Sequence, residues 1–290
     1  IGDFVRSGLR RGLELEAKVG ANPYKVGMIG STDSHTGMSS AEENNFHGKT
    51  AYDSIPENRF NTFIGIEGFG ADMSASGMAA AWSPVNNRQA LYEAFQRKEV
   101  YATTGPRIRV RFFGGWDYGG NDAGKSNIAE IGYANGVPMG GDLAKAPEGK
   151  APRFLVYAIK DPRGANLDRV QIVKGWLDAD GASKEKVYDV VWSDERVPEE
   201  DGSLKPVGNT VDLATGAYTN DIGDAQLSTV WEDPDFDPSA RAFYYVRVLQ
   251  IPTPRHTLYD AIALGMDPAD TKHPATIQER AYSSPIWYTP

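Results

Sequence analysis

The sequence has 290 residues, of which 40% are hydrophobic and 11% aromatic, so it can bury a substantial core in one large or two ordinary domains. Acidic residues outnumber basic ones by 39 to 30 and the formal net charge is −9, which disfavours general nucleic-acid binding because phosphate neutralisation needs clustered Lys and Arg. Cysteine is absent, which excludes disulfides, thiolate nucleophiles and cysteine-based zinc sites.

The N-terminal part of the chain is predicted to begin as an α/β unit. Apolar residues recur at helical spacing between charged residues over residues 3–18, which predicts an amphipathic helix. The run from Tyr24 to Ile29 then predicts a buried strand, and this strand leads into the glycine-flanked segment GSTDSHTG at residues 30–37. Helix, strand and loop in this order are typical of an α/β fold.

The next part of the chain is predicted to be irregular at first and then regular. Residues 38–83 are rich in Gly, Ala, Ser and Asn and show no sustained period, so we expect a long irregular loop with a functional role or mobility. Helical spacing returns over residues 86–98, and a short strand over residues 100–104 ends at Gly105 and Pro106.

After Pro106 the period changes to two, which indicates half-buried strands. The predicted strands cover residues 107–113, 153–159, 170–177, 187–192 and 242–249. Short strands separated by turn-forming residues favour a β-sandwich. A short helix is expected at about residues 257–264, and the apolar tail 284–290 is expected to dock on the protein. We therefore divide the chain into residues 1–104 and residues 105–290.

Asp33 and His35 are the first candidates for a functional site. Carboxylate and imidazole groups bind zinc, manganese and iron when thiolates are absent. Side chains at positions i and i+2 of an extended segment point the same way, so both residues could reach one metal cluster. Asp-x-His is a weak pattern by itself, and a helix N-cap Asp beside a surface His is the alternative.

Two residues of the long loop are further candidates. Glu43 could act as a general base or an additional ligand, although adjacent acids in a loop, here Glu42 and Glu43, are more often simply solvated. His47 shares the loop with Asp33 and His35 and is a candidate for the mouth of the site. The remaining two histidines, His256 and His273, lie at predicted turns and are expected to be structural.

Three long stretches resemble a known family. They are GSTDSHTG at residues 30–37, YATTGPRI at residues 101–108 and QERAYSSPIWY at residues 278–288. Together they are similar to the C-terminal part of an uncharacterised bacterial family within the polymerase-and-histidinol-phosphatase (PHP) superfamily of metal-dependent hydrolases.

The resemblance implies a distorted β/α barrel whose strand ends bind two or three divalent metals, which activate water for attack on an ester, most often a phosphoester. Asp33 and His35 match the last metal motif of that superfamily. The earlier motifs, which begin with His-x-His, are absent from this sequence. Residues 1–104 are therefore expected to be the closing segment of a PHP-like barrel, and residues 105–290 an antiparallel β-sandwich-like extension. Such a fragment should bind metal weakly or not at all by itself.

Two functions remain open at this stage. The first is a metal-dependent phosphoesterase that uses zinc, manganese or iron and acts on a small-molecule or other phosphoester substrate. The second is a non-catalytic binding or scaffold protein with a degenerate barrel and a ligand-binding β-sandwich. Exposed tryptophans in a groove would favour the second function, although we expect most of the strand tryptophans to be core; these are Trp116, Trp176, Trp192 and Trp231.

No apolar run approaches the roughly 18 to 20 residues that span a bilayer. We therefore expect a soluble bacterial protein without a membrane partner, in either the periplasm or the cytoplasm, since the absence of cysteine suits both compartments.

Overall fold

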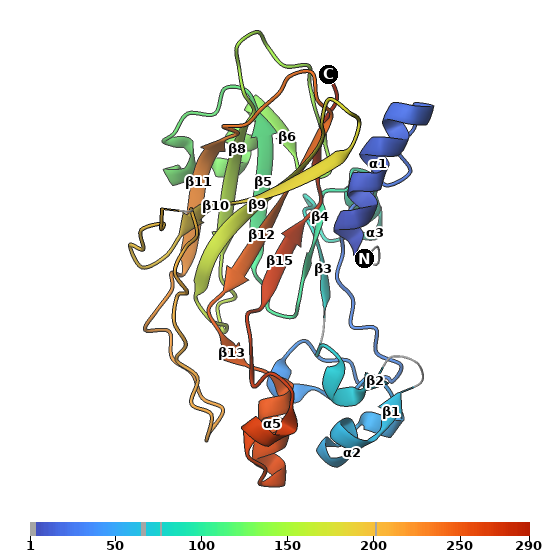
Figure 1. The fold of residues 1–290 in the computed structure, drawn as a ribbon, viewed down its shortest axis with the longest axis vertical. Coiled ribbons are helices and arrows are strands. Elements are labelled where there is room, and N and C mark those ends of the chain that lie inside the picture. The colour runs from blue at the N-terminus through green and yellow to red at the C-terminus, as the bar shows by residue number, and fades with distance from the viewer. Residues whose placement is uncertain (1–3, 65–67, 76, 201) are drawn as a thin grey trace.

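The protein consists of two packed β-sheets with a lobe of short helices and loops at one end (Figure 1). The computed structural model describes residues 4–64, 68–75, 77–200 and 202–290. The fold is mixed α/β with mostly antiparallel sheets, and the described residues form no closed barrel. No helix within the described ranges has the length and apolar character needed to cross a membrane.

The larger sheet combines strands from both parts of the chain. Its order is β10 (Ser183–Trp192), β9 (Leu167–Leu177), β12 (Ala242–Gln250), β15 (Arg280–Ser283), β4 (Val100–Thr103) and β3 (Met78–Ala81). Two further strands extend it: β16 (Ile286–Tyr288) pairs with β12, and β7 (Asp142–Leu143) pairs with β16 in parallel. Because β3 and β4 extend a sheet otherwise built after residue 105, the sheet continues across the predicted boundary at residue 104.

The smaller sheet packs on the larger one and closes the main core. Its order is β11 (Gln226–Glu232), β8 (Arg153–Ile159), β5 (Arg109–Gly115) and β6 (Gly136–Pro138). Phe154 links the two sheets, since its ring lies 5.5 Å from Phe112 in the same sheet and 4.5 Å from Tyr244 in the larger sheet. The alternation of inward and outward side chains along each strand produces this shared layer.

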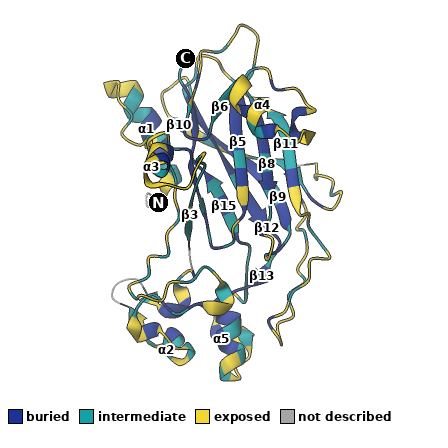
Figure 2. Ribbon diagram, turned by 180° about the vertical axis from the view of Figure 1, so that it is seen from behind, coloured by how far each residue is buried: buried dark blue, intermediate teal, exposed yellow. Residues whose placement is uncertain are grey.

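Helices cover the outer faces of both sheets. Helix α1 (Val5–Val19) places Leu9 and Leu13 against Phe243 and Trp287 of the larger sheet. Helix α4 (Ile128–Asn135) lies beside the smaller sheet, and α3 (Arg88–Gln96) precedes β4. Figure 2 shows that central strands such as β8, β9 and β12 are largely buried, whereas α1 and α3 have many exposed residues.

The lobe at the other end brings residues 43–72 together with residues 253–277. Its elements are η1 (Glu43–Asn45), η2 (Ala51–Asp53), α2 (Pro56–Asn61), β1 (Phe63–Ile64), β2 (Gly68–Phe69), η3 (Gly70–Asp72), β13 (Thr253–Pro254), α5 (His256–Leu264), η5 (Pro268–Thr271) and β14 (Thr276–Ile277). A buried ion pair between Arg59 of α2 and Asp260 of α5 joins the two segments. Arg255 adds hydrogen bonds of 2.9 Å and 2.7 Å to the carbonyl oxygens of Ala71 and Met73.

Most periodic segments form the predicted elements. Helices α1, α3 and α5 and strands β4, β5, β8, β9, β10 and β12 are confirmed, with boundaries shifted by a few residues. The C-terminal tail docks as predicted, because Ile286, Trp287 and Tyr288 are all at most 1% exposed and form β16.

The predicted buried strand at residues 24–29 is wrong. This segment has no regular structure, and Tyr24, Val26 and Ile29 are 40%, 42% and 54% exposed. The backbone N–H of Met28 donates to the Oγ of Ser284 at 2.9 Å rather than to a neighbouring strand. This backbone is held by a side chain from a distant segment and not by a neighbouring strand, so the local apolar pattern is misleading.

The prediction of a continuous irregular loop over residues 38–83 is wrong in part, because α2 and β3 lie within it. Both elements are short, and the Ala-rich strand β3 carries no strand-favouring residues. Helix α4 and strands β6, β7 and β11 were not predicted. Their lengths of eight, three, two and seven residues give little room for a hydrophobic period to show.

Candidate functional site

Asp33 and His35 lie together on an exposed turn near the lobe. Asp33 adopts the left-handed conformation with a φ of 49°, and the backbone N–H of His35 donates to the carbonyl of Lys49 at 2.7 Å. The Nε2 atom of His35 lies 3.6 Å from Oδ1 of Asp33, and the two side chains are 61% and 71% exposed. The structure thus brings the pair together through a tight turn, not through the extended segment we predicted.

Gly30 allows this turn to leave the edge of the larger sheet. A Cβ atom at Gly30 would lie 2.7 Å from the carbonyl oxygens of both Met78 and Thr103, so only glycine fits without a shift of the backbone. The adjacent Ser31 carbonyl accepts a hydrogen bond of 3.0 Å from the backbone N–H of Gly77. These contacts fix the direction in which Asp33 projects.

Lys49 forms an ion pair with Asp33 in this turn. Its Nζ lies 2.9 Å from Oδ2 of Asp33. The hydrogen bond from Lys49 and then its positive charge lower the pKa of Asp33 below the usual value, so the carboxylate is ionised at neutral pH. The turn borders a cavity of about 210 Å³ that is also lined by Phe46, Met73 and Gly77.

The donor set of this turn fits part of a metal site. A carboxylate oxygen and an imidazole nitrogen 3.6 Å apart have the chemistry and the proximity of two ligands to one ion. Within the described parts of the chain, however, no group of three or more His, Cys, Asp or Glu side chains could hold a metal ion. The turn therefore supplies two ligands at most, and Lys49 occupies one oxygen of the carboxylate.

A second constellation forms around Glu43, the acid of the long loop that the sequence suggested as a general base. The backbone N–H of His256, at the start of α5, donates to Oε2 of Glu43 at 2.6 Å. Glu279, between β14 and β15, lies against Glu43 and accepts a short hydrogen bond from the Oγ1 of Thr104. Three distant segments of the chain thus meet at a pair of carboxyl groups.

The carboxyl pair holds a proton at neutral pH. Burial, followed by the negative charge of Glu43, raises the pKa of Glu279 to about 8, while the hydrogen bond from Thr104 opposes the shift. Two carboxyl groups in contact cannot both ionise without strong repulsion, so the neutral Glu279 donates to its partner. The pair can therefore give up or take up a proton near physiological pH, as a general acid or base must.

The carboxyl pair lines a cavity of about 300 Å³. Arg107 and Arg163 lie on this cavity together with Tyr218 and Tyr259. Cationic and phenolic groups facing a proton donor can bind an anionic substrate and protonate it. Asp161 shapes this wall, because its Oδ2 accepts a hydrogen bond of 2.7 Å from the backbone N–H of Arg107.

His256 and Phe46 separate the two cavities. Their rings lie 4.4 Å apart, and the Nε2 of His256 lies 2.8 Å from the carbonyl oxygen of Met73, which borders the Asp33 cavity. The backbone N–H of the same histidine binds Glu43 in the other cavity. The two constellations are therefore neighbours that share one structural wall.

The other histidines are placed as follows. His256 is 1% exposed and acts structurally through its ring, as the sequence predicted. His273 lies 3.5 Å from Asp72 and burial lowers its pKa. His47 is half-buried and makes no hydrogen bond or ion pair with another described residue. The structure thus brings Asp33 and His35 together, and His47 makes no hydrogen bond or ion pair with either of them.

Glu279 and Thr104 are the residues of the site that sequence reasoning missed. Both lie within stretches that carry the family resemblance, but no local pattern marks either one as part of a buried pair. The strand tryptophans behave largely as predicted, since Trp116, Trp176 and Trp231 pack against the main core. The indole N–H of Trp192 donates to the carbonyl of Arg196 at 2.5 Å.

The fold and these contacts define a mixed α/β protein in which a helical lobe positions two polar constellations beside a pair of packed sheets. The sequence matches the family described as "Protein of unknown function (DUF3604)" over residues 1–290, and the chain belongs to this family. No curated protein and no solved structure matches the chain.

Proposed function

We propose that the chain is part of a metal-dependent hydrolase, most simply a phosphoesterase, in which Asp33 and His35 supply two ligands to a site of two or three divalent ions such as zinc, manganese or iron. The observation that carries this proposal is the exposed turn that holds a carboxylate and an imidazole 3.6 Å apart. The resemblance to the PHP superfamily supports it, with residues 1–104 as the closing segment of the barrel. The other ligands would then come from outside these residues.

The metal, when bound, would supply an activated water and a Lewis acid for the ester. On this chain, Asp33 is ionised, and its Oδ1 on the side of His35 would be the oxygen that binds the metal, since Lys49 pairs with Oδ2. Glu43 and Glu279 hold a proton between them in the neighbouring cavity, and this proton is suited to a leaving oxygen. Arg107 and Arg163, which line this cavity together with Glu42 and Asp161, would bind the anionic group of the ester.

Replacement of Asp33 or His35 by Ala in the full-length natural polypeptide is expected to lower its metal content by at least one ion per chain. Hydrolysis of a phosphodiester should fall by about a hundredfold or more. Loss of a residue that only hydrogen-bonds to a metal ligand typically lowers metal affinity or activity by about 10 to 100-fold, and loss of the ligand itself should cost at least as much. Metal content is measured by mass spectrometry and hydrolysis with a chromogenic phosphodiester.

Asp270→Ala and His273→Ala are the matched controls, since they remove the same chemical groups from another part of the lobe. Both should retain metal and activity. Unchanged metal content and hydrolysis in Asp33→Ala would rule out the assignment of that residue.

A further inference from the structure

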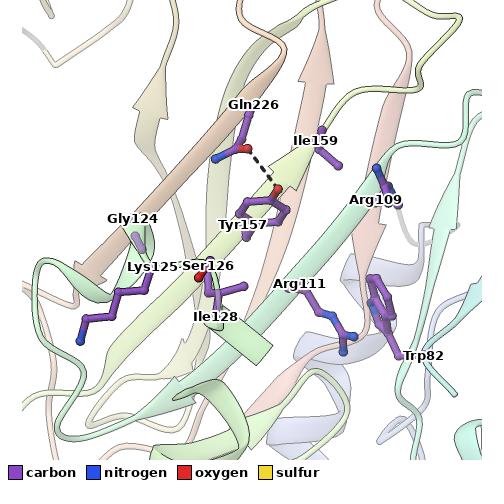
Figure 3. Close-up of a pocket in the computed structure, with 11 residues that line it drawn as sticks. Trp82, Arg109, Arg111, Gly124, Lys125, Ser126, Ile128, Tyr157, Ile159 and Gln226 are labelled. Carbon is purple, nitrogen blue, oxygen red and sulfur yellow. Dashed lines mark hydrogen bonds between the residues drawn. The ribbon is translucent and has the colours of Figure 1, made fainter. Parts of the chain in front are cut away.

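A cavity of about 380 Å³ lies on the outer face of the smaller sheet, away from both constellations of the lobe (Figure 3). The strand register builds its floor, because Arg109 pairs with Ile159 and Arg111 with Tyr157 across β5 and β8. Gln226 of β11 continues the same row opposite Ile159. The alternating charged residues of β5, which the sequence identified only as a half-exposed strand, thus project from one face.

The cavity is cationic although the chain as a whole carries a net charge of −9. Arg109, Arg111 and Lys125 line it, and none of the described lining residues is Asp or Glu. The side chain of Arg109 makes no ion pair or hydrogen bond with another described residue. An uncompensated guanidinium at a concave surface attracts anions.

The other two cations are only partly neutralised. Arg111 lies 3.8 Å from Glu99, but the same carboxylate also pairs with Arg97 at 3.4 Å. Lys125 pairs with Asp122 at 2.6 Å and is itself 53% exposed. The residues around the cavity therefore retain an excess of positive charge.

Aromatic and aliphatic side chains form the rest of the wall. The indole N–H of Trp82 donates to the carbonyl of Val110 at 2.8 Å, and the Arg111 guanidinium lies 3.3 Å from the Trp82 ring centroid. Both contacts fix the indole in place, and Figure 3 shows Arg111 beside Trp82. Ile128 and Ile159 add apolar surface. The Tyr157 hydroxyl donates to Gln226 at 3.1 Å, which leaves the Gln226 amide nitrogen as a further donor at the rim.

We propose that this cavity binds a small molecule that carries an oxyanion on an apolar ring. Arg109 and Arg111, which project from the same face of β5, bind the oxyanion, whether carboxylate, sulfonate or phosphate, and the ring packs against the isoleucines beside Trp82. The volume is within the range of small-molecule pockets, which combine mostly apolar walls with a few placed polar groups. The proposal is independent of the metal site.

Isothermal titration calorimetry with benzoate, benzenesulfonate and phenyl phosphate, each at fixed ionic strength, tests this proposal. We expect saturable binding of at least one of the three, and the preferred compound identifies the oxyanion. Arg109→Gln should weaken binding about tenfold, the loss expected for a charge-assisted hydrogen bond. Arg111→Gln should weaken it as well, and the double variant should abolish it.

Arg88→Gln is the matched control, because Arg88 is an exposed arginine on α3 that does not line the cavity. It should bind as the parent protein does. Circular dichroism confirms that each variant is folded. Absence of saturable binding for all three compounds would overturn the proposal, and so would binding that survives unchanged in the Arg109→Gln and Arg111→Gln double variant.

Discussion

Replacing Glu279 by Gln is expected to stabilise the protein at alkaline pH by roughly 2 to 4 kcal/mol. The pKa of Glu279 rises from 4.5 to about 8 on folding, chiefly through burial and then through the charge of Glu43. Ionised Glu279 is therefore costly in the folded state. A glutamine amide reproduces the protonated carboxyl, since its oxygen still accepts from Thr104 and its nitrogen donates to Glu43 at any pH.

The sign of the pH dependence follows from the raised pKa. Below about pH 4.5 Glu279 is protonated in both states, and its contribution to stability is fully present. Between about pH 4.5 and about pH 8 the unfolded chain loses this proton while the folded protein keeps it, so the free energy of unfolding falls as the pH rises. The Glu279→Gln variant should lack this fall.

Urea unfolding at a series of pH values measures the difference between the parent protein and the variant. Glu42→Gln is the matched control, because Glu42 is an exposed acid one residue from Glu43. Its curve should run parallel to that of the parent protein. A constant difference between the parent protein and Glu279→Gln at all pH values would show that Glu279 does not hold a proton in the folded state.

The sequence predicts the periodic parts of this fold well and its contacts poorly. Strand β8 is predicted with its observed bounds because six apolar residues follow Arg153 and turn-forming residues come soon after Ile159. The segment at residues 24–29 is also rich in apolar residues, yet it is irregular, because the backbone N–H of Met28 donates to the side chain of Ser284 and not to a strand. That side chain is 256 residues away from Met28, so no local pattern could reveal it.

In the candidate sites, too, residues close in the sequence could be predicted to lie together, whereas residues far apart could not. Asp33 and His35 are two positions apart, so their proximity could be predicted even though the turn that produces it could not. Glu279 is a different case, because Thr104 lies 175 residues before it and Glu43 even further. The cavity of Figure 3 depends on the register of three strands, and only the Arg109–Arg111 spacing is visible in the sequence.

The buried ion pair between Arg59 and Asp260 is expected to contribute strongly to the stability of the lobe. Both side chains are 5% exposed, and two nearly parallel hydrogen bonds of 2.6 Å and 2.5 Å join them. Burial opposes ionisation of Asp260, but the hydrogen bonds from Arg59 and His256 hold its pKa below the usual value. The carboxylate is thus ionised and fully engaged, and removal of one partner leaves the other charge buried without compensation.

Asp260→Asn and Arg59→Met are each expected to lower the free energy of unfolding by about 3 to 5 kcal/mol, as for other broken buried ion pairs. The double variant Arg59→Met with Asp260→Leu should lose less than either single variant, because no isolated charge remains. Glu232→Gln, which breaks the more exposed pair with Arg153, should cost no more than about 1 kcal/mol.

Urea unfolding of the four variants at neutral pH tests these differences. Additive losses in the double variant would contradict a buried, coupled pair. Because α5 begins at His256, whose backbone N–H binds Glu43, a loosened lobe should also release the carboxyl pair. The single variants should therefore lose the pH dependence of Glu279 along with their stability, whereas Glu232→Gln should keep it.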